Sequence, residues 1–250
     1  MTAGFQDYYS GHAADYRAFR PAYPRELFAH LASIAPGRDL AWDCGTGSGQ
    51  AAVGLAEHFT RVFATDASDD QVRSAQPHPR VEYAVARAEK CPLQDHCVDL
   101  VTVAQALHWF DLARFYEEVC RVSRPGGVLA VWTYELQSVN PAVDAMLRRF
   151  QEDFVGPYWP PDRVWVDTHY RTIPFPFPEL PAPRFDMRAE WNLPRMLGYM
   201  STWSATKAFI KVKGFDPVER LAGEFAAAWG DPAQVRTVRW ELTVRIGRVE

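Results

Sequence analysis

A short glycine-rich loop follows an apolar segment and an acidic residue near the start of the chain. Residues 40–43 read Leu-Ala-Trp-Asp, and Gly45, Gly47 and Gly49 then alternate with small or polar residues. Glycine has no Cβ, so it allows sharp turns with positive φ and lets a ligand touch the backbone closely. The loop therefore predicts a site for a nucleoside-containing cofactor, and a helix is expected to follow from Gln50 to Phe59.

A second acidic residue ends the next apolar run, residues 61–66. Asp66 lies 17 residues beyond Gly49, close to the distance of about 20 residues at which an acid accepts hydrogen bonds from a cofactor's ribose. Asp66 could instead cap the following helix, but Ser68 or Asp69 would serve equally well there. We therefore favour ribose binding for Asp66.

The spacing of the glycines separates two classes of cofactor. Dinucleotide-binding proteins use Gly-x-Gly-x-x-Gly, whereas here Gln50 occupies the position of the third glycine. The pattern of Asp43, Gly45, Gly47 and Gly49 resembles instead the first motif of the class I S-adenosylmethionine (SAM)-dependent methyltransferases, an acid followed by Gly-x-Gly-x-Gly. A nicotinamide-dependent oxidoreductase stays open as an alternative that would need the loop to accept a pyrophosphate.

The resemblance implies a set of SAM contacts along the chain. Ala88 would meet the adenine through its backbone N–H and Glu89 through its side chain, although a loop acid such as Glu89 is equally expected to lie in water. Aromatic rings suit the sulfonium of SAM, because a ring face attracts a cation. The full expected set is Tyr16, Asp43, Gly45, Thr46, Gly47, Gly49, Asp66, Ala67, Ala88, Glu89 and Gln105.

Polar and aromatic residues follow the apolar run at 99–104. Ligands of open α/β sheets bind beyond the carboxyl ends of the strands, so Gln105, His108 and Trp109 should face the cofactor or the methyl acceptor. Imidazole titrates near neutral pH, which makes His108 a candidate general base. There are two alternatives: His108 could be a structural residue bonded to the backbone, or it could only position the acceptor.

Two aromatic segments resemble the small-molecule branch of the family. Residues 16–24 contain the string Tyr-x-x-x-Arg-Pro-x-Tyr-Pro, which is expected to cross the SAM pocket, with Tyr16 near the sulfonium. Residues 199–204 contain Tyr-x-x-Thr-Trp-Ser, similar to the trans-aconitate methyltransferase-like group. The likeness would place Tyr199, Ser201 and Trp203 over the acceptor, whereas helical spacing i, i+4 would make Tyr199 and Trp203 core residues. For the N-terminal aromatics, too, the alternative is that they pack the N-terminal helices onto the core.

Alternating apolar runs and helical segments must position these residues. From residue 40 to 132 they predict right-handed βαβ units, and the resemblance implies a Rossmann-like α/β fold with a seven-stranded, mostly parallel sheet. Residues 237–246 alternate apolar and polar side chains, as expected for a final antiparallel strand. We expect one domain: an N-terminal helical cover (1–36), a SAM-binding core (37–136), an inserted, proline-rich lid that selects the acceptor (137–210), and a C-terminal helix and strand (211–250).

Composition excludes several partners. The 250 residues carry a formal net charge of −4 with a pI near 6.0, which gives no general attraction to nucleic acid. The four cysteines match no zinc spacing and are expected to be reduced, so no metal is predicted. No run approaches the roughly 20 apolar residues that cross a bilayer. We expect a cytoplasmic protein, without nucleic-acid or membrane partners, for which a homodimer is compatible with the sequence.

The sequence thus predicts a methyltransferase that acts on a small-molecule acceptor. A carboxylate acceptor could attack as an anion, held by Arg20, Arg195, Lys207 or Lys211. A hydroxyl, amine or carbon acid would instead need a base, for which His108 is the candidate. A SAM-binding regulator without activity is the remaining alternative.

Overall fold

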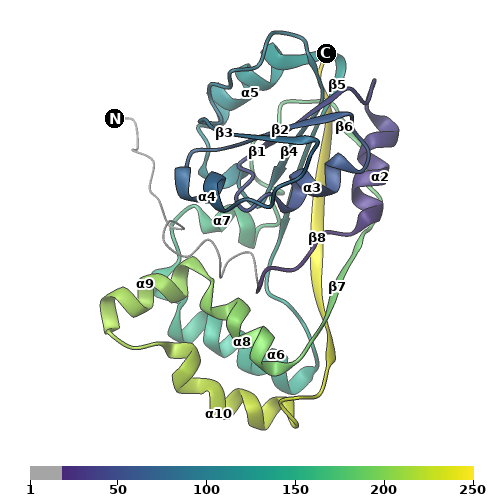
Figure 1. Ribbon diagram of the computed structural model, residues 1–250. Helices are drawn as coiled ribbons and strands as arrows, with labels where there is room; N and C mark the ends of the chain where they lie inside the picture. The colour runs from purple at the N-terminus through teal and green to yellow at the C-terminus, as the bar shows by residue number, and fades with distance from the viewer. Residues whose placement is uncertain (1–18) are drawn as a thin grey trace.

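The structure is a computed structural model that describes residues 19–250. Figure 1 shows two lobes, one built around a sheet and one made of helices, with the C-terminal strand running from one to the other. The prediction for Tyr16 concerns a residue outside the described range, as does most of the predicted N-terminal cover. The described part of that cover contains α2 (Arg25–Ile34).

The central sheet has the order β3-β2-β1-β4-β5-β8-β6. The five strands β1 to β5 pair in parallel, and β8 runs antiparallel to each of its neighbours. The mostly parallel Rossmann-like sheet with an antiparallel last strand is therefore confirmed. The strands are β1 (Leu40–Cys44), β2 (Arg61–Asp66), β3 (Val81–Val85), β4 (Val98–Ala104), β5 (Ser123–Tyr134), β6 (Glu179–Leu180), β7 (Asp186–Trp191) and β8 (Arg236–Arg248).

One strand exceeds the predicted seven. Strand β7 pairs with the first half of β8, from Trp191 opposite Arg236 to Asp186 opposite Glu241. The second half of β8 pairs with β5 on one side and β6 on the other. Because β8 is 13 residues long, it reaches beyond β5 and β6 into the helical lobe. There β7 provides the backbone hydrogen bonds for the first half of β8.

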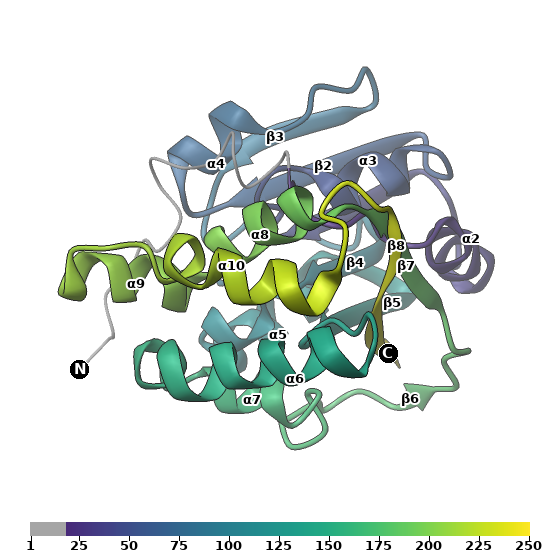
Figure 2. The same cartoon turned by 90° about the horizontal axis from the view of Figure 1, so that it is seen from below.

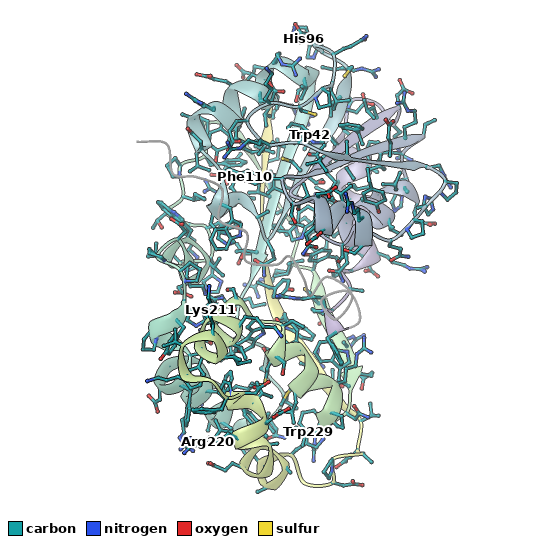
Figure 3. All side chains as sticks on the ribbon, turned by 60° about the vertical axis from the view of Figure 1, so that its left-hand side comes forward. Trp42, His96, Phe110, Lys211, Arg220 and Trp229 are labelled. Atoms are coloured by element: carbon teal, nitrogen blue, oxygen red, sulfur yellow. The ribbon has the colours of Figure 1, made fainter. Side chains whose placement is uncertain are left out.

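Helices cover both faces of the sheet, and successive residues of β1 enter different cores. Trp42 packs with α5 (Leu112–Val122), whereas Ala41 packs with α2 and α3 (Gln50–Ala56). All five residues of β1 are buried, as expected for a parallel strand covered on both faces. Figure 3 shows Trp42 within this lobe.

The helical lobe gathers segments from both sides of β7. It contains α6 (Pro141–Arg149), a π-helical turn (Phe150–Phe154), α8 (Leu193–Ser201), α9 (Ser204–Lys213) and α10 (Pro217–Trp229). The predicted boundary at 210/211 falls inside α9, and α10 shares an apolar core with α6 and α8. Residues 211–229 therefore pack with the predicted lid.

Side-chain caps start four of the longer helices. Asp111, Asn140, Asn192 and Asp216 each accept a backbone N–H at the start of a helix, α5, α6, α8 and α10 respectively. Short turns lie between these elements, including α7 (Arg163–Asp167) and the 3-10 helix η1 (Leu107–Trp109). The prolines between residues 174 and 183 lie in a segment with a two-residue strand, in agreement with the predicted lack of long elements.

The carboxyl ends of the parallel strands face the helical lobe. Strand β5 leads directly from the sheet to α6, and in the view from below α6, α8 and α10 lie beneath the sheet (Figure 2). The residues that follow β1, β2 and β4 therefore lie at the edge where ligands of open α/β sheets bind.

Candidate functional site

The glycine loop is held against the end of β2 by backbone hydrogen bonds. Gly45, Gly47 and Gly49 have φ values of 70°, 52° and 84°, a region that side chains with a Cβ rarely adopt. The N–H groups of Gly45 and Thr46 both donate to the Thr65 carbonyl, at 2.8 and 2.9 Å. The loop thus forms a cradle of backbone atoms at the carboxyl end of β1.

Neighbouring side chains leave no room for substitution at two of these glycines. A Cβ at Gly45 would lie 2.6 Å from the Ala106 Cβ, and a Cβ at Gly49 would overlap the Tyr83 hydroxyl. Gly45 and Gly47 are part-exposed, so a ligand can reach the backbone there. Gly45 and Gly49 therefore need glycine for both conformation and space, and Gly47 for conformation.

Asp66 connects the glycine loop with the turn after β2. Its Oδ2 accepts the Gly47 N–H at 2.9 Å and its Oδ1 accepts the Ser68 N–H at 2.9 Å. The side-chain cap of α4 (Asp69–Ser74) is Ser68, as the sequence allowed. Asp66 and the next residue, Ala67, are part-exposed, and ribose binding by Asp66 stays a prediction.

Asp43 is fully buried beneath the loop. Its carboxylate accepts hydrogen bonds from the hydroxyls of Thr46 and Thr102, at 2.6 and 2.8 Å. Desolvation raises the pKa of Asp43 to about 6, although both hydroxyl bonds oppose the rise. In this structure Asp43 fixes the loop from below through Thr46.

The predicted adenine contacts lie on the loop after β3. Ala88 is buried, and the Glu89 Oε1 accepts the Asp111 N–H at 3.1 Å, with Arg87 Nε 3.8 Å from the other oxygen. Glu89 therefore helps to hold the segment before α5. Its proposed contact with an adenine amino group stays a prediction.

Gln105 follows β4 with φ of 56°, an uncommon conformation for a residue with a side chain. Its amide nitrogen donates to the Tyr134 carbonyl at 2.8 Å, and its amide oxygen accepts the Thr133 hydroxyl at 2.6 Å. The side chain is thus committed to the end of β5. It holds the two strand ends together and lines the pocket described next.

A pocket that is partly open to solvent lies between the two lobes. We call it the interlobe pocket. The sheet edge contributes Gln105, His108 and Trp109 after β4 and Tyr134, Glu135 and Leu136 after β5, and the helical lobe and its connections contribute Arg20, Gln151, Trp159, Pro160, Arg163, Val166, Tyr199, Trp203 and Ser204.

His108 lies on the sheet side of the interlobe pocket. Burial lowers its pKa to about 3, with a smaller contribution from the Arg163 guanidinium, so the imidazole is neutral at neutral pH. Its Nδ1 lies 2.7 Å from the Tyr170 hydroxyl, and its ring lies 4.5 Å from that of Trp109. The alternative of a histidine bonded to backbone is wrong, because the partner is a side chain.

Tyr199 and Trp203 are core residues, as the helical spacing predicted, and their placement over the acceptor stays a prediction. Tyr199 and Trp203 are buried in the core of the helical lobe and also line the interlobe pocket. Ser201 does not line it: its hydroxyl donates to the Leu197 carbonyl within α8, because the i−4 carbonyl is in reach. Ser204, at the start of α9, lines the pocket instead.

Arg20 and Arg163 bring positive charge to the interlobe pocket. Arg20 lies over the Tyr199 ring, 5.3 Å from its centre, and its Nη1 donates to the Tyr134 hydroxyl at 3.4 Å. The Arg163 guanidinium lies 4.1 Å from the Trp159 ring and pairs with Asp167.

The other predicted cations lie elsewhere. Arg195 stacks on the Trp191 ring, and neither Lys207 nor Lys211 lines the pocket. Figure 3 shows Lys211 on the helical lobe. Of the four predicted anchors for a carboxylate, the structure therefore brings Arg20 to the pocket.

Sequence reasoning missed the contributions of Trp159, Arg163 and Tyr170. They come from the irregular segment between α6 and β7, where no periodic pattern assigns a face to any side chain. The proline pair before Arg163 marked a turn but gave no indication of what lies opposite it.

Two expected absences concern metals and membranes. Among residues 19–250, no group of three or more His, Cys, Asp and Glu side chains is arranged to hold a metal ion. No helix in the same range is long and apolar enough to cross a membrane.

Comparison with known proteins identifies relatives of the chain. Residues 42–131 match a family described as "Methyltransferase domain". A provisionally assigned methyltransferase of Dictyostelium discoideum is 38% identical over 221 residues, which cover 87% of this chain and 84% of the relative. An uncharacterized methyltransferase of Mycobacterium bovis is 42% identical over 121 residues, about half of each chain.

A solved structure extends the similarity to the whole fold. A provisionally assigned type II methyltransferase from Anaeromyxobacter dehalogenans is 49% identical and superposes with a TM-score of 0.86, covering 92% of this chain and 98% of the other. The helical lobe is therefore shared with this relative, together with the sheet.

Proposed function

Because this chain belongs to the class I SAM-dependent methyltransferases, we propose that it transfers the methyl group of SAM to a small-molecule carboxylate bound in the interlobe pocket. The family decides between the cofactors considered above: the enzyme uses SAM, and the nicotinamide alternative and the regulator without activity are set aside. The acceptor and the residues that bind it are the subject of the proposal.

The residues present fit SAM at the glycine loop. The loop offers part-exposed backbone at Gly45 and Gly47, and the Asp66 carboxylate lies beside it. We assign the ribose hydroxyls to Asp66, the methionine part to the loop, and the adenine to the segment with Ala88 and Glu89. When bound, SAM supplies a methyl group already activated by its positive sulfur.

The observation that carries the acceptor proposal is the position and charge of the interlobe pocket. Gln105 directly follows β4, the strand next to β1, and also lines the pocket. The pocket therefore adjoins the carboxyl edge at which the glycine loop lies. Its wall contains aromatic rings and the Arg20 guanidinium. A small acceptor with an apolar body and a carboxylate matches this wall, because a guanidinium pairs well with a carboxylate.

The chemistry asked of the protein is mainly positioning. A carboxylate is ionised at neutral pH and attacks without a base, so the protein accelerates the reaction by aligning oxygen, methyl and sulfur and by excluding water. The buried rings of Tyr199 and Trp203 serve the second role. The product is a methyl ester together with S-adenosylhomocysteine.

The test is transfer of labelled methyl from SAM to a metabolite extract, followed by identification of the labelled product. We expect a base-labile methyl ester, with Arg20→Gln raising the acceptor KM about tenfold or more and leaving the SAM dissociation constant unchanged. Arg195→Gln is the matched control, because Arg195 lies outside the pocket. A labelled amine or ether would contradict the carboxylate proposal.

A further inference from the structure

The hydrogen bond between His108 and Tyr170 joins two segments that are distant in sequence. The Tyr170 side chain is fully buried, and its hydroxyl lies 2.7 Å from the His108 Nδ1. His108 belongs to the sheet edge, whereas Tyr170 follows α7, 62 residues later. The contact therefore depends on how the chain folds after α7.

A strained turn presents Tyr170 to His108. His169 and Tyr170 both have positive φ, 54° and 56°. Any residue other than glycine in this left-handed conformation destabilises the fold by roughly 1 kcal/mol or more. Among residues 19–250, four residues other than glycine have positive φ, and two of the four are the neighbours His169 and Tyr170. Such strain persists only when surrounding contacts fix it.

Arg245 of β8 provides these contacts. Its Nη1 donates to the carbonyls of Tyr170 and Ile173, both at 2.9 Å, while its Nη2 pairs with Glu179 at 2.6 Å. His169 in turn lies 3.5 Å from Glu135. The turn is thus tied to the sheet on both sides of Tyr170, and the phenol is held in one place.

The direction of the hydrogen bond follows from the chemistry of the two groups. A phenol is a stronger donor than a neutral imidazole N–H, and the unprotonated imidazole nitrogen is a stronger acceptor than a phenol oxygen. The favoured pair therefore has the Tyr170 O–H donating to Nδ1. In the neutral ring the proton then lies on Nε2.

The other ring nitrogen is left for the interlobe pocket. Within the described part of the chain, the hydrogen bond of the His108 ring runs through Nδ1, and the ring lines the pocket. An Nε2 that carries a proton donates a hydrogen bond and cannot accept a proton. His108 would then offer the acceptor molecule a donor at a fixed position.

We propose that Tyr170 is a positioning residue that holds His108 as its Nε2–H tautomer, so that His108 donates a hydrogen bond to an oxygen of the methyl acceptor and does not act as a base. This assignment rests on the proposed function of the interlobe pocket. It also states what the acceptor must present to His108: an oxygen with a free lone pair, such as the carboxylate oxygen that is not methylated.

The tautomer can be measured without any acceptor. The full-length protein is labelled with ¹⁵N in its histidine rings, and the signals of His108 are identified among the seven histidines by comparison with His108→Asn. We expect a pyridine-type Nδ1 and a pyrrole-type Nε2 at pH 7. A pyrrole-type Nδ1 in the wild-type protein would overturn the proposal, and this result does not depend on the folding of any Tyr170 variant.

Tyr170→Phe then tests the role of the phenol. We expect this variant to show a mixture of both His108 tautomers, because Nδ1 has lost its donor. Tyr116→Phe is the matched control: it removes another buried phenol, which donates to the Pro174 carbonyl away from the pocket, and should leave the His108 signals unchanged. An unchanged tautomer in a folded Tyr170→Phe would also overturn the proposal.

The kinetic consequence separates this proposal from the proposed function. Once the acceptor is identified, Tyr170→Phe should raise its KM about fivefold or more with an unchanged SAM dissociation constant, and Tyr116→Phe should do neither. Equal KM values in Tyr170→Phe and wild type would contradict the positioning role. If labelled methyl reaches no carboxylate, the proposed function fails while the tautomer result stands on its own.

Discussion

At the scale of single residues, the cofactor site depends on backbone geometry and on one carboxylate. Three glycines with positive φ form the cradle, and Asp66 links it to β2 by accepting the Gly47 N–H. Each feature makes a different contribution, so each can be removed separately.

Asp66→Ala should weaken SAM binding more than tenfold, about 1.4 kcal/mol or more. The variant loses the acceptor for the ribose hydroxyls and also frees the Gly47 N–H. Calorimetric titration with SAM measures the change. Asp69→Ala is the control, because Asp69 is exposed and pairs with Arg73 on α4. Equal dissociation constants for Asp66→Ala and wild type would remove Asp66 from the ribose site.

Gly49→Ala should be more damaging than the same change at Gly214. Both glycines have positive φ, but a Cβ at Gly49 would overlap the Tyr83 hydroxyl, whereas a Cβ at Gly214 would meet nothing within 4 Å. Gly214→Ala should cost the backbone strain alone, about 1–2 kcal/mol of unfolding free energy. Urea unfolding measures both variants; equal losses would show that the contact with Tyr83 is unimportant.

At the scale of elements, a short segment before α2 links the two lobes. The Phe19 ring packs against Gly198 of α8 so closely that a Cβ there would overlap it, and Arg20 lies over Tyr199. Further along the same segment, the Pro21 carbonyl accepts the amide of Gln50 at the start of α3. This segment therefore connects the acceptor side of the interlobe pocket to the helix behind the glycine loop.

Gly198→Ala should separate the segment from α8. Alanine favours a helix over glycine by about 1 kcal/mol, but here its methyl group would displace Phe19. Gly223→Ala in α10 is the matched control, because it adds the same methyl group with nothing within 4 Å. We expect Gly223→Ala to stabilise the protein and Gly198→Ala to be less stable than it by about 1–3 kcal/mol. Equal effects in chemical unfolding would refute this packing.

The helix caps and the parallel strands could be predicted because they depend on local signals. An Asn or Asp directly before a helix is such a signal, and Asn140, Asn192 and Asp216 each cap a helix. The parallel strands β1 to β5 likewise coincide with apolar runs, from which the βαβ units were predicted. The predicted helix from Gln50 ended too late: α3 stops at Ala56, where a tighter turn at Leu55 closes it. Such end effects depend on the packing of the following residues.

The site could be predicted where it follows a strand end, and not where it comes from an irregular segment. His108 and Trp109 reach the pocket because β4 ends before them. Trp159 and Arg163 line the pocket, and Tyr170 contacts His108, from an irregular segment that is held by long-range contacts such as the bond from Arg245 to the Tyr170 carbonyl. No local pattern encodes a contact across 75 residues.

At the scale of the whole molecule, a buried charge at the centre of the sheet links stability to pH. The pKa of Asp43 is raised from 3.8 to about 6 in the folded protein. A raised pKa means that the folded state binds a proton more tightly than the unfolded state. The resulting stabilisation is fully present below pH 3.8 and is lost as the pH rises through about 6.

Asp43→Asn should remove this dependence. Between pH 4.5 and 7.5 the Asp43 carboxyl should lower the wild-type unfolding free energy by about 2 kcal/mol, a loss that the asparagine variant lacks. The comparison uses urea unfolding of both proteins at the two pH values, so that other titrating groups cancel. Parallel pH dependences in the two proteins would show that Asp43 does not titrate in this range.

The central claim is that the glycine loop and Asp66 hold SAM with its methyl group directed at the interlobe pocket. A crystal structure with S-adenosylhomocysteine tests it most directly. We predict ribose hydroxyls within hydrogen-bond distance of the Asp66 carboxylate and a sulfur atom facing Gln105 and His108. A nucleoside bound away from Asp66, or a sulfur atom turned away from the pocket, would contradict the account.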